Sequence, residues 1–550
     1  MKKTLLFLFV VIGSMTSYAQ LIPAPETLKF NKGHFVLDAT TGIVVTGLEP
    51  QDGSKLIHYL TDKIETETGV RLSSQKGKVK NIVFEVLNHP SKNLGEEGYL
   101  LNISSAEINI VANSYAGLFY GTQSLLQYVI ANKMQSPIKI PNLSISDKPN
   151  VAWRGMNMDV SRHFFNSNAI KELLDLLAFY KMNVFHWHLA DNEGWRLEIK
   201  KYPKLTDIGA WRTEIPGSIM YKKDSTYTKK LDGEPYQYGG FYTQEQVKEI
   251  VAYAKDRNIT IVPEIDVPGH SGAALSAYPE FSCEKHIQET PNSTLWNGVV
   301  NPENVNLNYC AGQESTFEFL ENVFTEVMDL FPSKYIHVGG DEVDKSYWKK
   351  CATCQKRMTD ESLKDENELQ SYFIKRVAKF LETNDRKLIG WDEILEGGAP
   401  KNATVMSWRG EKGGIEAAKL QQQVIMIPND PLYFNRYQDD PKNEPLAEIW
   451  GINTLEKVYN YNLIPTELTK EEATYIIGGQ FAIWTEFISS VEYLEYTLLP
   501  RMPAFAENMW SIPEKKRYSG FIERLNRMHY DYWKANGIRF HPKHYIKSVY

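Results

Sequence analysis

The stretch Tyr335-Ile336-His337-Val338-Gly339-Gly340-Asp341-Glu342 joins an apolar run to two glycines and two adjacent carboxylates. Such a run is typical of a buried strand, and the glycines allow the backbone to turn sharply after it. Neighbouring side chains on a regular strand point to opposite faces, so Asp341 and Glu342 can share a pocket only if the chain turns after Val338. The stretch therefore predicts a buried strand that ends in a turn carrying two carboxylates.

The adjacent carboxylates have two interpretations. They can form a solvated acidic turn that closes the strand, or they can face a partly dry cleft. In such a cleft, ionisation of one carboxyl group disfavours ionisation of the other, which leaves an anion beside a neutral acid. A pair of this kind is suited to cleavage of a glycosidic bond, and the rest of the sequence has to decide between the two interpretations.

Short apolar runs recur from Val151 onward and alternate with amphipathic helical patterns, which indicates a parallel sheet built from βα units. The candidate strands are 155–158, 183–188, 260–264, 335–338, 387–390, 404–408, 424–427 and 479–484. Eight such units predict a (β/α)8 TIM barrel, and polar and aromatic residues follow the carboxyl ends of its strands, where barrel active sites form.

The chain before the barrel divides into a leader and a small domain. Lys2 and Lys3 precede an apolar run, and Ser17-Tyr18-Ala19 offers small residues for cleavage, so residues 1–19 are predicted to be a secretory signal peptide. No later stretch reaches the roughly 20 apolar residues of a membrane span. The prediction is therefore an exported protein, periplasmic or extracellular, without a transmembrane segment. Residues 20–148 predict an amino-terminal α/β domain, and 149–550 the barrel.

Composition excludes one class of partner. The chain has 61 basic and 68 acidic residues and a net charge of −7, which argues against nucleic-acid binding. Its 550 residues suffice for more than one domain and a large core.

The four cysteines are Cys283, Cys310, Cys351 and Cys354. In an exported protein they are first of all disulfide candidates, and Cys283 with Cys310 would tie down a long loop between the third and fourth barrel strands. Cys351-Ala352-Thr353-Cys354 has the spacing of half a zinc site, but no second Cys or His pair follows it. A local disulfide or free thiols is the preferred interpretation of that motif.

Several motifs in this order resemble the signatures of one enzyme family. They are Trp153-Arg154-Gly155, Asp159-Val160-Ser161-Arg162-His163-Phe164-Phe165, His186-Trp187-His188-Leu189, Pro263-Glu264-Ile265-Asp266-Val267-Pro268-Gly269-His270, His337-Val338-Gly339-Gly340-Asp341-Glu342 and Trp484-Thr485-Glu486. The resemblance is to the β-N-acetylhexosaminidases of glycoside hydrolase family 20, and it covers nearly the whole mature chain.

This resemblance implies an exo-acting, retaining β-N-acetylhexosaminidase without a metal or organic cofactor. Glu342 would be the general acid and base, and Asp341 would orient the sugar's 2-acetamido group while its oxygen attacks the anomeric carbon. The implied partner is a glycan with a terminal β-linked N-acetylhexosamine.

The resemblance also assigns binding roles. Arg162 would hold O3 and O4 of the terminal sugar, and Asp191 with His270 would adjust the protonation of the general acid. Trp391, Trp408 and Trp484 would form aromatic walls, Tyr433 would donate to the acetamido carbonyl, and Glu486 would accept from sugar hydroxyls. For most of these positions the alternative is an ordinary ion pair, loop contact or core packing.

Asn435 and Arg436 depart from the more common pattern, in which an Asp stands two residues after the Tyr. A neutral Asn435 and a cationic Arg436 can contact a 6-O-sulfate, which an Asp would repel. The hypothesis is that the enzyme accepts or prefers 6-sulfated N-acetylglucosamine from mucin-type or keratan-type glycans. The alternative is that Asn435 replaces Asp without consequence and Arg436 points into solvent.

Two other functions remain open at this stage. A conventional two-carboxylate β-glycosidase could use the same barrel and would hydrolyse sugars that lack an acetamide. A non-catalytic carbohydrate-binding protein would keep the tryptophans but would not need the acid pair.

Overall fold

The computed structural model describes residues 20–74, 76–213, 228–229, 237–292 and 305–546, and these form two compact units. The first unit comprises the described residues up to Asp147, together with Ser519–Tyr532 and the described residues from His544 onward. The second comprises the described residues of Lys148–Tyr518 and Trp533–Lys543. The two carboxyl-terminal segments of the first unit fall within the range 149–550 that was predicted to belong to the barrel.

The predicted signal peptide, residues 1–19, lies outside the described residues. Within the described part of the chain, no helix is both long enough and apolar enough to cross a membrane.

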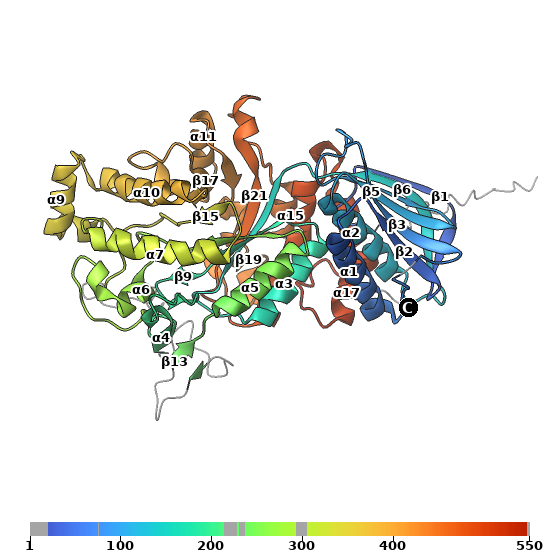
Figure 1. Cartoon of the computed structure of the whole chain (residues 1–550), viewed down its shortest axis with the longest axis horizontal. Helices are drawn as coiled ribbons and strands as arrows, with labels where there is room; N and C mark the ends of the chain where they lie inside the picture. Colours follow the sequence, from blue (N-terminus) through green and yellow to red (C-terminus); the bar gives the residue numbers. More distant parts are fainter. Residues whose placement is uncertain (1–19, 75, 214–227, 230–236, 293–304, 547–550) are drawn as a thin grey trace, which may run out of the picture. The chain divides into compact units, whose positions relative to one another are not determined.

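The first unit contains a six-stranded mixed sheet with the order β1-β6-β4-β5-β3-β2. Its strands are β1 (Thr27–Leu37), β2 (Thr41–Thr46), β3 (Lys80–Val86), β4 (Tyr99–Ile103), β5 (Glu107–Ala112) and β6 (Ile138–Asp147). Helices α1 (Pro50–Thr68) and α2 (Tyr115–Ala131) lie on one face of this sheet (Figure 1). The pairing of β1 with β6 shifts register between Phe30 and His34.

The second unit contains, within the described residues, a closed barrel of eight parallel strands. In order around the barrel they are β7 (Trp153–Asp159), β8 (Val184–His188), β14 (Thr260–Glu264), β15 (Tyr335–His337), β16 (Lys387–Trp391), β17 (Thr404–Ser407), β18 (Val424–Met426) and β21 (Ile476–Ile483). Each corresponds to one of the predicted strands with small differences at the ends. The predicted TIM barrel, preceded in the sequence by a small α/β domain, is confirmed.

Apolar side chains fill the barrel. Val262, Ile389, Met406 and Ile425 are completely buried and belong to one core cluster. Every residue of β7 and β8 is buried, as expected for parallel strands that are covered on both faces.

The outer helices are α3 (Ser167–Phe179), α5 (Gln244–Lys255), α7 (Glu314–Leu330), α10 (Glu366–Thr383), α11 (Lys412–Lys419), α13 (Leu455–Asn460), α14 (Val491–Leu498) and α15 (Arg501–Trp510). Helices α3 and α5 lie side by side (Figure 1). Thr243 and Gln246 form a capping box at the start of α5, which satisfies amide groups that the helix leaves unpaired. Between β16 and β17 the described chain has only the short 3-10 helix η5 (Asp392–Leu395), so residues after Trp391 stay close to the barrel mouth.

The predicted disulfide between Cys283 and Cys310 is wrong, because all four cysteines are unbonded. The chain after β14 folds so that both cysteines approach Cys354, with Sγ–Sγ distances of 3.7 Å from Cys283 and 3.6 Å from Cys310.

Candidate active site

The turn after β15 brings the two carboxylates to the barrel mouth. Gly339 and Gly340 have φ of 67° and 97°, so the backbone turns where the sequence predicts it. A Cβ atom on Gly339 would lie 1.7 Å from Oδ1 of Asp266, so a side chain there would collide with a buried carboxylate. The next two side chains differ in exposure: Asp341 is 9% exposed, whereas the side chain of Glu342 is 60% exposed.

His270 faces both carboxylates from the loop after β14. Its Nε2 atom lies 3.6 Å from Oδ2 of Asp341 and 3.5 Å from Oε2 of Glu342. His270 and Glu342 both have left-handed backbone conformations, with φ of 48° and 50°. Residues other than glycine rarely adopt this conformation. Two such residues that face each other are typical of a functional site.

Asp191 anchors the other side of the His270 ring. Its Oδ1 atom lies 3.0 Å from Nδ1 of His270, and its Oδ2 atom lies 2.9 Å from Nε2 of His188 and 2.7 Å from Arg162. Burial alone would raise the pKa of Asp191, but the charges of Arg162 and His270 hold it well below its ordinary value. Asp191 is therefore an anion that orients His270.

Glu264, at the end of β14, holds three histidines beneath this site. Its carboxylate lies 2.5 Å from Nδ1 of His188, 3.0 Å from Nε2 of His186 and 2.8 Å from Nδ1 of His337. It also accepts a hydrogen bond of 3.0 Å from the indole N–H of Trp391. Although burial opposes ionisation, these neighbours keep the pKa of Glu264 well below its ordinary value.

A continuous series of charged contacts thus runs from Glu264 through His188 and Asp191 to His270. Burial lowers the pKa of His270, but Asp191 and Asp341 outweigh burial and raise it well above the ordinary value. His270 is therefore a cation beside the two catalytic candidates, where it can stabilise negative charge and respond to a change in their protonation.

The pKa values of the two carboxylates are shifted in opposite directions. Burial, against the opposing charge of His270, raises the pKa of Asp341 to about 6, with Glu264 and Glu342 contributing. The facing imidazole of His270 lowers the pKa of Glu342. In the ligand-free site Asp341 is therefore the more easily protonated of the two.

Arg162 occupies an acidic cluster after β7. Besides Asp191, its guanidinium contacts Asp159 at 3.4 Å and Glu193 at 2.9 Å, and it lies 5.3 Å from the ring of Trp484. Glu486 stands nearby, and burial, opposed by Arg162, raises its pKa to about 7. Its Oε2 atom is buried and has no hydrogen-bond partner among the described residues, so it is available to a ligand hydroxyl.

The aromatic residues of the site differ in their burial and position. Trp391 is only 1% exposed and packs 4.7 Å from His337, so it forms part of the floor. Trp408 stacks on Tyr433 with a centroid distance of 6.1 Å and an interplanar angle of 13°. Trp484 is partly exposed and lies 6.2 Å from Tyr433, so these rings line a common wall.

Asn435 and Arg436 extend this wall. Asn435 is 5% exposed, and its buried Oδ1 atom has no hydrogen-bond partner among the described residues. Arg436 belongs to β19 (Arg436–Tyr437), which pairs with β20 (Glu448–Ile452), and its guanidinium lies 5.9 Å from the ring of Tyr433. The Arg436 side chain therefore turns toward Tyr433.

Sequence reasoning did not single out several charged residues of this region. Glu393 accepts a hydrogen bond of 2.9 Å from the indole of Trp408, and burial beside Asp341 raises its pKa to about 9. Burial and Asp341 also raise the pKa of Asp266 well above its ordinary value. The available signal was position, because Asp266 follows β14 closely and Glu393 follows β16. Asp266, His188 and Glu264 stood within quoted motifs but received no role.

Three clusters of His and carboxylate side chains near the site, all buried except the partly exposed His270, bring possible metal-ligating atoms together. They are His186-Glu264-His337, His188-Asp191-Asp266 and Asp266-His270-Asp341. Contacts already join Glu264 to His186 and His337, and Asp191 to His188. We therefore interpret these groups as a network that positions His270 and the catalytic loop.

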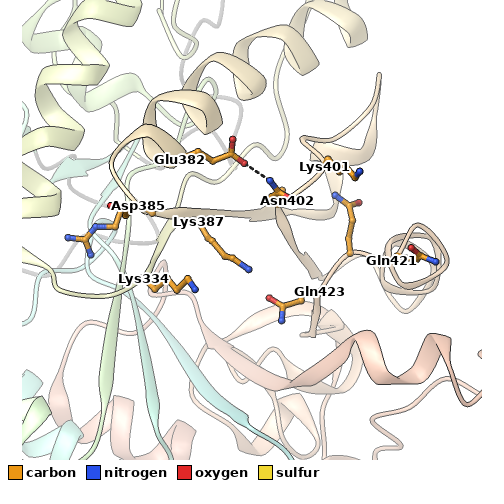
Figure 2. A pocket seen from close by; sticks show the side chains of 11 residues that line it. Lys334, Glu382, Asp385, Lys387, Lys401, Asn402, Gln421 and Gln423 are labelled. Atoms are coloured by element: carbon orange, nitrogen blue, oxygen red, sulfur yellow. Dashed lines mark hydrogen bonds between the residues drawn. The ribbon is translucent and has the colours of Figure 1, made fainter.

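A polar groove lies at the opposite end of the barrel. It is lined by residues that immediately precede strands, including Lys334 before β15 and Gln423 before β18, and by Asn402, which bonds Glu382 at 3.0 Å (Figure 2). Because Asp341 and Trp391 lie at the carboxyl ends of their strands, this groove contains none of the predicted site residues.

A TIM barrel whose mouth holds an adjacent Asp-Glu pair, a cationic His and an aromatic wall defines an acid-base enzyme of the glycoside hydrolase class. "Glycosyl hydrolase family 20, catalytic domain" matches residues 151–513, and "Glycosyl hydrolase family 20, domain 2" matches residues 18–148. The chain belongs to glycoside hydrolase family 20.

Known relatives agree with this assignment. The chain is 43% identical over 514 residues to a beta-hexosaminidase of Porphyromonas gingivalis, covering 92% of this chain and 62% of that protein. An exo β-N-acetylglucosaminidase from Vibrio harveyi, solved with N-acetylglucosamine, has a TM-score of 0.81 at 30% identity over 95% of this chain and 78% of that one. A β-N-acetylhexosaminidase from Bacteroides fragilis has a TM-score of 0.78 at 30% identity over 95% and 97%. The chain spans 62% to 66% of the length of three sequence relatives.

Proposed function

We propose that the protein is an exo-acting, retaining β-N-acetylhexosaminidase that uses the 2-acetamido group of its substrate as nucleophile. The observation that carries the proposal is the placement of His270, whose Nε2 atom faces Asp341 at 3.6 Å and Glu342 at 3.5 Å. The names of the family relatives, including the Vibrio harveyi enzyme with bound N-acetylglucosamine, support the same activity.

In the proposed reaction the acetamido oxygen attacks the anomeric carbon while the bond to the leaving oxygen breaks. Glu342 gives its proton to that oxygen, and Asp341 stabilises the positive charge of the cyclic oxazolinium intermediate. Glu342 then removes a proton from the water that opens the ring, which restores both the acid and the β configuration. No second protein nucleophile is required.

Binding of the sugar has to change the order of the two pKa values. In the ligand-free site His270 lowers the pKa of Glu342, and 60% of the Glu342 side chain is in contact with solvent. A glycan that covers this side chain excludes water, which disfavours the anion and raises the pKa of Glu342. Asp341 meanwhile keeps its charge where the acetamide nitrogen can donate to it. We therefore place the general acid at Glu342 and the orienting anion at Asp341.

The remaining residues have roles in holding the terminal sugar. Arg162 supplies guanidinium donors for sugar hydroxyls, and the unpartnered Oε2 of Glu486 accepts from them. Trp408, Tyr433 and Trp484 contribute apolar surface for the sugar and its acetamido methyl group.

The test compares Glu342→Gln with wild type on aryl N-acetyl-β-glucosaminides that have good and poor leaving groups. We expect a loss of about 100-fold or more for the poor leaving group and a smaller loss for the good one in single-turnover measurements. Glu361→Gln, on the exposed surface after α9 (Ala352–Asp360), is a matched control that should leave both rates unchanged. Equal losses with both leaving groups would contradict the acid role.

Two further measurements separate the rival functions. A conventional two-carboxylate enzyme would hydrolyse aryl β-glucosides, whereas the proposed enzyme should hydrolyse only sugars with the acetamide. A thiazoline analogue of the cyclic intermediate should inhibit the proposed enzyme. Failure to inhibit where the product binds well would exclude substrate assistance, and lack of hydrolysis with any sugar would favour a binding protein.

We also propose that the site accepts, and prefers, a 6-O-sulfated terminal N-acetylglucosamine. Asn435 contributes a buried amide with an unpartnered Oδ1 atom, and Arg436 contributes a guanidinium whose buried Nε atom has no hydrogen-bond partner among the described residues. Burial lowers the pKa of Arg436 from its ordinary value, but the group stays cationic at neutral pH. A partly desolvated cation of this kind can pair with a sulfate.

Arg436→Ala tests this specificity. A hydrogen bond to a charged group contributes about 1.5 to 3 kcal/mol, so kcat/KM should fall roughly tenfold or more on the sulfated substrate and little on the plain one. Arg409→Ala, which removes a cation that contacts Asp392 at 2.9 Å, is the comparison variant. Equal losses on both sugars, or rejection of the sulfated sugar by wild type, would leave plain N-acetylhexosamine as the substrate.

The leader motivates a proposal about location. We propose that residues 1–19 direct export and are removed, so that the mature chain acts in the periplasm or outside the cell. Cell fractionation with amino-terminal sequencing tests this, and an intact leader on a cytoplasmic enzyme would contradict it.

A further inference from the structure

The four cysteines gather from two separate segments of the second unit. Cys283 follows the 3-10 helix η2 (Pro279–Phe281), and Cys310 precedes α7. Cys351 lies between α8 (Ser346–Lys350) and α9, and Cys354 lies in the first turn of α9. They are the only cysteines of the chain, so every thiol it has is in this cluster.

The spacing of the sulfur atoms is that of a metal site. The Sγ–Sγ distances are 3.7 Å between Cys283 and Cys354, 3.6 Å between Cys310 and Cys354, and 3.9 Å between Cys310 and Cys351. All four sulfur atoms lie within 4.8 Å of one another. A tetrahedral ion with metal–sulfur bonds of about 2.3 Å holds its sulfur ligands about 3.8 Å apart, so one ion fits among these four atoms.

The surroundings suit a closed structural site. Cys310 is 2% exposed and Cys354 is fully buried, whereas Cys283 and Cys351 are partly covered. Cys351 and Cys354 stand at the amino-terminal end of the nine-residue helix α9, whose dipole favours thiolates. With four protein ligands, no coordination position remains for a substrate, which is the pattern of structural rather than catalytic zinc.

We propose that Cys283, Cys310, Cys351 and Cys354 bind one structural Zn²⁺ ion. The Cys351-Ala352-Thr353-Cys354 motif is then half of a four-cysteine site whose other half precedes it in the chain. Four thiolates in tetrahedral spacing match the ligand preference of zinc, and iron in the same geometry would be recognised by its spectrum.

The ion would tie together the two loops that carry the catalytic residues. Cys283 and Cys310 belong to the connection after β14, which also contains His270. Cys351 and Cys354 belong to the connection after β15, which also contains Asp341 and Glu342.

Hydrogen bonds continue from the cysteines to these loops. The amide of Tyr309, next to Cys310, donates to the carbonyl of Pro268 at 2.8 Å, and Trp348 donates to the carbonyl of Tyr309 at 3.0 Å. Asn308 also bonds the carbonyl of Asp344 at 2.7 Å. Zinc would therefore be a positioning element for His270 relative to the carboxylates.

The experiment measures metal and thiols in the full chain, purified without chelators or a polyhistidine tag. We expect about one zinc per chain by elemental analysis, four thiols that react only after zinc is removed, and thiolate-to-cobalt charge-transfer absorption when Co²⁺ replaces zinc. Cys354→Ser should reduce the bound zinc to under about a tenth of an equivalent, while the exposed Thr353→Ser between the two ligands should retain it.

Wild-type protein provides a test that does not depend on whether the variant folds. Removal of zinc by a chelator should lower the melting temperature, and Zn²⁺ but not Mg²⁺ should restore it. Peptide mapping that finds Cys283–Cys354 and Cys310–Cys351 disulfides would overturn the proposal, as would four reactive thiols without metal or stoichiometric iron with a rubredoxin-like spectrum. The metal content does not depend on the proposed glycosidase activity, so each proposal can fail while the other stands.

Discussion

The Asp191→Asn variant gives the sharpest test of the series of contacts that leads to His270. Asp191 receives contacts from Arg162 at 2.7 Å, His188 at 2.9 Å and His270 at 3.0 Å. An amide keeps only one oxygen acceptor. The variant keeps two of the three contacts if the amide oxygen faces Arg162 and His188. Its NH2 group then faces His270, and the contact with His270 is lost.

The expected loss follows from this geometry. The variant removes one hydrogen bond between charged groups, worth about 1.5 to 3 kcal/mol, and such a loss corresponds to roughly 10- to 150-fold in kcat/KM. Because Asp191 is the largest influence that raises the pKa of His270, the pKa of His270 should fall. His270 would then lose its charge at a lower pH, so the basic limb of the pH profile, which reports loss of this cation, should move to lower pH.

The assay measures kcat/KM against pH on aryl N-acetyl-β-glucosaminides, with folding checked by circular dichroism and denaturant unfolding. Asp207→Asn, at an exposed position of α4 (Lys204–Asp207), is the control and should change neither rate nor profile. A folded Asp191→Asn enzyme with wild-type kcat/KM and an unmoved basic limb would refute the proposed role of the series.

Two other predictions concern the catalytic turn. Gly339→Ala adds a Cβ atom 1.7 Å from Asp266 at a φ of 67°, so chemical denaturation should show a loss of about 2 to 5 kcal/mol; unchanged stability would contradict the described turn. The raised pKa of Asp341, about 6, predicts that kcat/KM falls as the pH rises above about 6, because the proposed reaction needs one proton on the carboxylate pair and both groups are ionised above this pH. The folded protein then binds this proton more tightly than the unfolded chain, so Asp341 destabilises the fold at higher pH. Asp341→Asn should therefore raise the free energy of unfolding at neutral pH by up to about 3 kcal/mol, a gain that disappears below the ordinary pKa of 3.8. An Asp341→Asn protein that is no more stable at neutral pH, or a wild-type profile that is flat through pH 6, would contradict the assigned pKa.

The sequence by itself determined the barrel and its catalytic turn, because both depend on local sequence patterns. Apolar runs of strand length recur at regular intervals, and two glycines stand where Asp341 and Glu342 must turn into the mouth. Polar residues just beyond strand ends, such as Arg162 and His270, meet at one face because parallel strands of a barrel all end there.

Only the tertiary structure decided the electrostatics and the fate of the cysteines. The pKa values of Asp341 and Glu342 depend on burial and on His270, which is some 70 positions away in the chain, and no local pattern encodes that distance. Trp391 became part of the floor because its indole bonds Glu264 beneath the site. Cys283 and Cys310 lie in one connection, but the packing of that connection against α9 turns both toward Cys354 rather than toward a disulfide with each other. Contacts of this kind arise from the closure of the barrel and its loops, which a linear pattern does not contain.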